Sequence, residues 1–82
     1  MASKEDLQRL DSSILAVLCK KVAEDTAIEN EAAEKAWKLN REWALLMIRL
    51  TPQPIDYKVN DQLREEEKKL VIRMADFLAT VL

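Results

Sequence analysis

The sequence predicts an all-α protein, and three observations lead to that prediction. Residues 5–50 contain neither Gly nor Pro, and their apolar side chains recur at helical spacing. The whole chain has no Gly and two Pro, so few loops are expected. With 49% hydrophobic and 34% charged residues, the composition is too apolar for a disordered chain.

One long amphipathic helix is expected over residues 4–50. Ser3 and Asp6 have the spacing of a capping box at its start. Glu5 and Asp6 also place negative charge in the first turn, where the helix dipole favours it. The apolar residues cover more than half of the helix circumference, which is wider than the stripe that one neighbouring helix needs. We therefore expect this helix to contact more than one other helix.

A break in this helix is the alternative. Thr26 and Glu29 could form a second capping box, which would divide the stretch into helices 4–24 and 26–50. Together with a C-terminal helix, these would make a three-helix bundle. We favour the continuous helix because a connection with neither Gly nor Pro is unusual between helices.

A Pro-bracketed turn at residues 51–55 is expected to end the long helix, because proline cannot continue the hydrogen-bond ladder. A shorter return helix is expected over residues 56–82, packed antiparallel on the first as a helical hairpin. Counted from the turn, Val59 and Leu63 are expected to meet Trp43 and Met47. Farther along, Met74 and Phe77 are expected to meet Ala32 and Ala36.

Such a hairpin leaves part of the long helix uncovered. A return helix of about 27 residues spans about 40 Å, whereas a continuous first helix of about 46 residues spans about 70 Å. The N-terminal apolar strip is then without a cover from its own chain, and we expect an oligomeric helical bundle or coiled coil to bury it. The candidate interface residues are this strip and the two tryptophans: Leu7, Leu10, Ile14, Val17, Leu18, Trp37 and Trp43.

Three charged residues interrupt the apolar seam of the predicted helix: Lys21, Asp25 and Glu29. Polar groups in a helical seam often select one register or partner at some cost in stability. We interpret these three residues as register-setting polar groups that meet charges of a partner chain or the Leu82 carboxylate.

Composition argues against several kinds of site. Thirteen basic and fifteen acidic residues are interspersed and give a net charge of −2, so no basic face is expected to bind nucleic acid. The chain has no His and one Cys, Cys19, so we expect no disulfide framework, no metal site and no cofactor. No apolar run reaches the length of a membrane span or signal peptide, so a cytoplasmic or nuclear location is expected.

One resemblance points to an enzyme. The residues Leu7, Leu10, Asp11, Ile14, Leu15 and Leu18 follow a spacing that resembles the opening of the first helix in all-helical chorismate mutases. The resemblance covers a minor part of the chain, and it implies an intertwined dimer with a cationic pocket for a dianionic substrate. Lys20 and Lys21 stand where that family would place an arginine, and an acidic run follows them.

The function expected from the sequence is non-enzymatic. We expect a helical protein–protein interaction or oligomerisation subunit of a larger intracellular complex, a scaffold or adaptor that binds itself, other helical proteins or both. The alternatives are a small helical enzyme of chorismate-mutase-like fold and an amphipathic binder of membrane surfaces.

Overall fold

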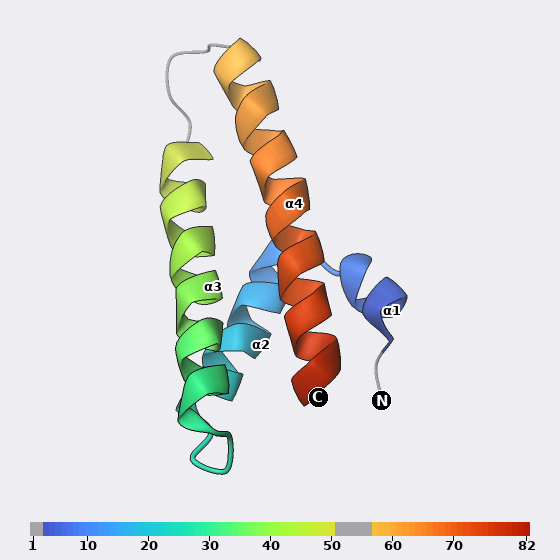
Figure 1. Ribbon diagram of the computed structural model, residues 1–82. Helices are drawn as coiled ribbons and strands as arrows, with labels where there is room; N and C mark the ends of the chain where they lie inside the picture. The colour runs from blue at the N-terminus through green and yellow to red at the C-terminus, as the bar shows by residue number, and fades with distance from the viewer. Residues whose placement is uncertain (1–2, 51–56) are drawn as a thin grey trace.

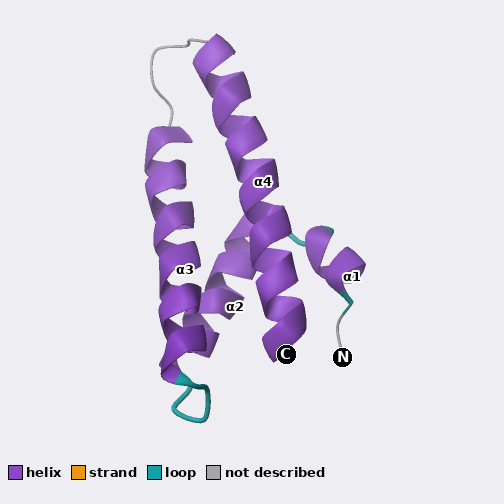
Figure 2. Ribbon diagram, viewed as in Figure 1, coloured by secondary structure: helices purple, strands orange, loops and turns teal. Residues whose placement is uncertain are grey.

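A computed structural model describes residues 3–50 and 57–82, and in the last helix it describes side chains from Asp61 onward. Every regular element in this part of the chain is an α-helix, which confirms the all-α prediction (Figure 2). The elements are α1 (Lys4–Gln8), α2 (Ser12–Glu24), α3 (Asn30–Leu50) and α4 (Tyr57–Val81).

The three longer helices form the body of the molecule, and the short α1 lies against α4. In Figure 1, α3 and α4 point in opposite directions along the long axis, and α2 lies behind their lower half. The molecule is elongated, with extents of 44 × 23 × 15 Å. The ends of α3 and α4 away from α2 therefore pack as a two-helix segment.

The single long helix predicted over residues 4–50 is wrong, because the chain breaks twice within it. The first break follows α1, whose predicted cap is present: the Asp6 backbone N–H donates to Ser3 Oγ at 3.2 Å. Asp11 then takes an extended backbone conformation, with ψ of 147°, and its carbonyl accepts from Ile14 N–H at 3.0 Å. This geometry starts α2 in a new direction.

The second break lies between α2 and α3, close to the alternative boundary at residues 24–26. Asp25 ends α2, and its carboxylate Oδ1 accepts a hydrogen bond from Ala27 N–H at 2.9 Å. This is an Asx-turn, in which a side chain replaces the backbone acceptor of a turn and glycine is not needed. The three-helix alternative is therefore right about this break, but it misses the earlier break at Asp11.

The core is apolar and draws on every helix. The packing of α2 on α3 is close: Ala16, Cys19 and Ala36 are fully buried, and Asn40 Nδ2 of α3 donates to the Ala16 carbonyl at 2.8 Å. Small side chains permit this approach of one backbone to the next. The buried residues are Leu7, Leu15, Ala16, Cys19, Val22, Ala36, Leu39, Leu46, Leu63, Leu70, Met74, Ala75, Phe77 and Leu78.

Two ion pairs give the register between α3 and α4. Glu42 contacts Arg73 at 2.7 Å, and Arg49 contacts Glu66 at 3.2 Å. The expected pairing of Leu63 with Trp43 is therefore wrong by about two turns, because the start of α4 extends beyond the end of α3 instead of lying level with it (Figure 1). The predicted turn at 51–55 and the Val59 side chain lie outside the described residues.

Candidate interaction surfaces

Cys19, the one nucleophilic thiol, is unsuited to chemistry. Cys19 lies on α2. Its side chain has no exposed surface and packs in the core. Burial raises the pKa of the thiol to about 11, because desolvation disfavours the thiolate. The thiolate is the nucleophilic form, so Cys19 acts as a small buried hydrophobe.

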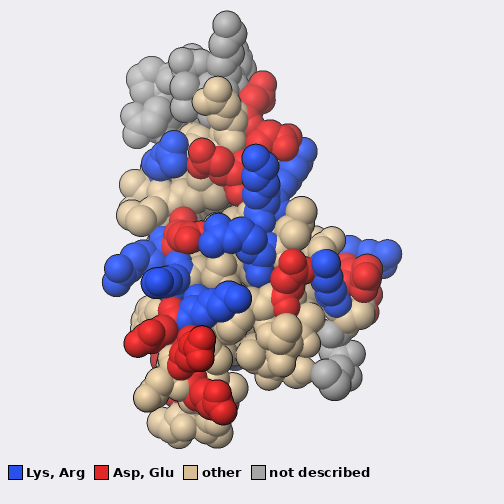
Figure 3. Space-filling view, viewed as in Figure 1, with Lys and Arg blue, Asp and Glu red and all other residues tan. Residues whose placement is uncertain are grey.

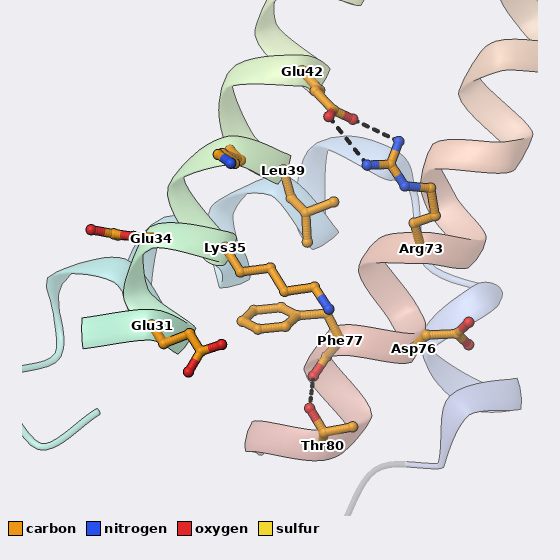
Figure 4. A pocket seen from close by; sticks show the side chains of 10 residues that line it. Glu31, Glu34, Lys35, Leu39, Glu42, Arg73, Asp76, Phe77 and Thr80 are labelled. Carbon is orange, nitrogen blue, oxygen red and sulfur yellow. Dashed lines mark hydrogen bonds and ion pairs between the residues drawn. The ribbon is translucent and has the colours of Figure 1, made fainter. Parts of the chain in front are cut away.

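A groove of about 680 Å³ runs between the lower parts of α3 and α4 (Figure 4). Arg73 of α4 donates two hydrogen bonds to the Glu42 carboxylate of α3, at 2.7 and 3.1 Å. Lys35 Nζ lies over the Phe77 ring, 5.7 Å from its centroid. Arg73 and Lys35 are thus engaged by groups of the same chain and link the two helices across the groove, while Lys38 also lines it.

A polar junction connects α2 with α3 and α4. The Trp43 indole N–H donates to Ser12 Oγ at 2.9 Å, and the Ser12 hydroxyl donates to Glu67 Oε2 at 2.8 Å. Glu67 Oε1 in turn contacts Arg64 Nη1 at 3.1 Å. The indole ring of Trp43 is half-buried against the core, so this tryptophan has a structural role.

The outer flank of α3 carries large apolar side chains in contact with solvent. Trp37, Leu45 and Ile48 are 48%, 56% and 66% exposed. Eleven residues separate Trp37 from Ile48, about three helical turns, so the two project from the same side of α3 with Leu45 beside them. We call this surface the Trp37 flank and include in it the half-buried Ala33 and Ala44.

The outer face of α2 carries a smaller apolar surface. Ile14 and Val17 are 45% and 53% exposed, and Leu18 beside them is half-buried. The opposite face of α2 enters the core through Leu15 and Val22. We call Ile14 and Val17 the α2 patch.

The side of the molecule seen in Figure 3 differs from these apolar surfaces. Basic and acidic side chains are mixed over α3 and α4 there, with no area of a single sign covering the view. The exposed ion pairs of the described residues include Arg49 with Glu66 and Lys68 with Glu65. Exposed pairs of this kind contribute little to stability, so this is a solvated surface.

The structure divides the predicted interface residues into three groups. Leu7 is in the core against α4, so the expectation that the whole N-terminal strip lacks a cover from its own chain is wrong for this residue. Because the chain turns after α2, this helix packs against α3 and α4. A continuous helix would have carried these residues away from both. Leu10, Leu18 and Trp43 are half-buried, and Ile14, Val17 and Trp37 are exposed.

The predicted register residues do not lie inside a helical seam. Lys21 is exposed near the end of α2, Asp25 ends that helix and Glu29 precedes α3. The Asp25 carboxylate shapes the loop through its bond to Ala27 N–H. Contact of these three residues with a partner chain stays a prediction.

Leu45 and Ile48 are absent from the predicted interface set, although they are more exposed than any residue in it. The signal in the sequence is the width of the apolar surface on residues 30–50, which exceeds what one neighbour needs. Periodicity reveals that width but not which edge stays uncovered, because that depends on where α2 packs.

Comparisons of the chain with models of protein families, with curated proteins and with solved structures found no match. Within the described residues, no helix combines the length and apolar character needed to cross a membrane. In the same part of the chain, no group of three or more His, Cys, Asp or Glu residues is placed to hold a metal ion.

Proposed function

We propose that this chain is a non-enzymatic helical association module, which binds a second copy of itself and can serve as a subunit of a larger complex. The observation that carries the proposal is the Trp37 flank, where three large apolar side chains are about half exposed or more. Monomeric proteins rarely leave contiguous apolar surface of this kind uncovered, and aromatic anchors are enriched at interfaces.

The energy available from covering these side chains supports association. Fully burying one large apolar side chain contributes roughly 1.5 to 3 kcal/mol, and residues that are half exposed retain about half of that gain. Trp37, Leu45 and Ile48 together could then contribute a few kcal/mol before the costs of association. This is a gross gain for one copy, a two-fold dimer gains it twice, and only the part that exceeds the costs of association appears as affinity, so we expect a reversible complex.

The α2 patch supports the same kind of function with less surface. Two aliphatic side chains, Ile14 and Val17, are exposed there. The enzyme alternative has no comparable support, because Cys19 is protonated and two of the cations that line the α3–α4 groove, Arg73 and Lys35, are engaged by Glu42 and Phe77.

Solution mass tests the proposal. We expect light scattering to give a dimer or larger species that dissociates on dilution through the micromolar range. Glu31→Lys changes an exposed charge outside both apolar surfaces and should leave the mass unchanged. A folded protein that is monomeric up to several hundred micromolar would contradict the proposed function.

A further inference from the structure

Charged side chains of both signs surround Trp37 on α3. Glu34, Trp37, Lys38 and Arg41 line one shallow depression of about 430 Å³ on the outer side of the helix. Glu34 and Lys38 also line the edge of the α3–α4 groove, and in Figure 4 the Glu34 side chain points to the side of α3 away from α4. The depression therefore has a half-exposed aromatic ring with an acid on one side along the helix and bases on the other.

These charges have no partner among the described residues. On the α4 side of the same helix, Glu42 and Arg49 are each paired with a residue of α4. Glu34, Lys38 and Arg41 make no ion pair with any other residue that the structure describes. The apolar side chains of the Trp37 flank thus have charged side chains beside them that can pair with a second molecule.

We propose that a second copy of this chain docks on the Trp37 flank, with the two α3 helices antiparallel and the two-fold axis close to Trp37. Trp37 packs against the partner's Trp37, and Glu34 pairs with the partner's Arg41. This inference rests on the proposed function and specifies its surface and partner.

The spacing along the helix fits this symmetry. Glu34 precedes Trp37 by three residues and Arg41 follows it by four, which correspond to about 4.5 and 6 Å along the axis. Because the two axial offsets are nearly equal and the two side chains carry opposite charges, both Glu34–Arg41 pairs can form at once, as a two-fold interface requires. Ile48 then lies level with the partner's Ala27, which is exposed in the α2–α3 loop.

Charge also selects this register and this partner. Moving the axis to Arg41 would place two arginines against each other, and like charges across an interface are unfavourable. Where charged groups of a two-fold interface face their own copies, both signs must be present in one patch, and this patch has both. The flank from Ala33 to Ile48 is about 22 Å long, so we expect an interface near the low end of the roughly 1,200–2,000 Å² typical of specific complexes.

Charge reversal and mixing test the proposal. Glu34→Arg places two cations on each copy at the interface, and Arg41→Glu places two anions there. Each variant alone should dimerise about tenfold more weakly than the parent at low salt, as measured by sedimentation equilibrium. An equimolar mixture of the two variants should recover the parental mass, because the mixed dimer keeps one Glu34–Arg41 pair and forms the other with its charges exchanged.

Arg9→Glu is the matched control, because it makes the same charge reversal on an exposed residue at the end of α1 and should keep the parental mass. The docking geometry is overturned if the two variants dimerise like the parent, or if their mixture stays as weak as each variant alone. A parental dimer that Val17→Asp dissociates and Trp37→Asp does not would retain the association function and place it on the α2 patch. A monomeric parent would overturn both proposals.

Discussion

At the residue scale, Ser12 shows how one small polar group can connect three helices. Its hydroxyl accepts from the Trp43 indole on α3 and donates to the Glu67 carboxylate on α4, both within 2.9 Å. The contact satisfies the polar atom of a half-buried tryptophan, whose unpaired N–H would otherwise cost free energy. Trp43 and Trp37 lie six residues apart on one helix, yet one is a packing residue and the other is exposed.

Cys19 allows a test of burial through pH. The pKa of its thiol is about 11 in the folded protein and 9.0 is the ordinary value, so the folded state holds the proton more tightly. The associated stability is fully present below pH 9 and is lost as pH rises toward 11. We expect the free energy of unfolding in denaturant to fall between pH 7.5 and 10.5 by about 2 kcal/mol more in the parent than in Cys19→Ala.

The Cys19→Ala variant keeps every lysine and tyrosine, so it corrects for their titration in the same range. Parallel pH profiles for the two proteins would show that the thiol is not desolvated in the fold.

At the element scale, the breaks between helices explain which features were predictable. The all-α class, the Ser3 cap and the approximate extent of the last helix follow from periodicity and from proline chemistry. The break at Asp11 does not, and the break near Asp25 is expected only as the alternative, because both occur without glycine or proline. At Asp25 the carboxylate takes the place of a backbone acceptor, so the usual compositional sign of a turn is missing.

The candidate surface was predictable to a similar degree. Trp37, Ile14 and Val17 are named by the sequence and are exposed, whereas Leu7 is named and buried. The difference arises because α1 and α2 turn back onto α4, an arrangement set by two local turns that the apolar pattern does not encode.

Asp25 provides the test at this scale. Asp25→Ala removes the acceptor for Ala27 N–H and should lower the free energy of unfolding by about 1 kcal/mol, the usual contribution of such a bond. Asp25→Asn keeps a side-chain oxygen and should recover most of that loss in the same denaturant titration. Equal stability of Asp25→Ala and the parent would show that the loop does not depend on the Asx-turn.

At the scale of the whole molecule, the placement of α2 determines which surfaces remain open. Because α2 covers the lower half of α3 and α4, the core there is three helices thick, while the other end of α3 and α4 is a pair (Figure 1). The Trp37 flank lies on the side of α3 that neither α2 nor α4 covers, which leaves Trp37 and Ile48 exposed. A second copy of the chain would bury that flank and pair its free charges.

The most direct measurement of this account is the concentration dependence of the two tryptophan indole signals in ¹H–¹⁵N NMR spectra. Trp37 lies at the proposed two-fold axis, whereas the Trp43 indole N–H is held by Ser12 inside the fold. On dilution from millimolar to low micromolar concentration, we expect the Trp37 signal and the amides of residues 34–48 to shift together, while the Trp43 indole stays in place. Spectra that do not change with concentration, or shifts confined to Ile14 and Val17 on α2, would contradict docking through the Trp37 flank.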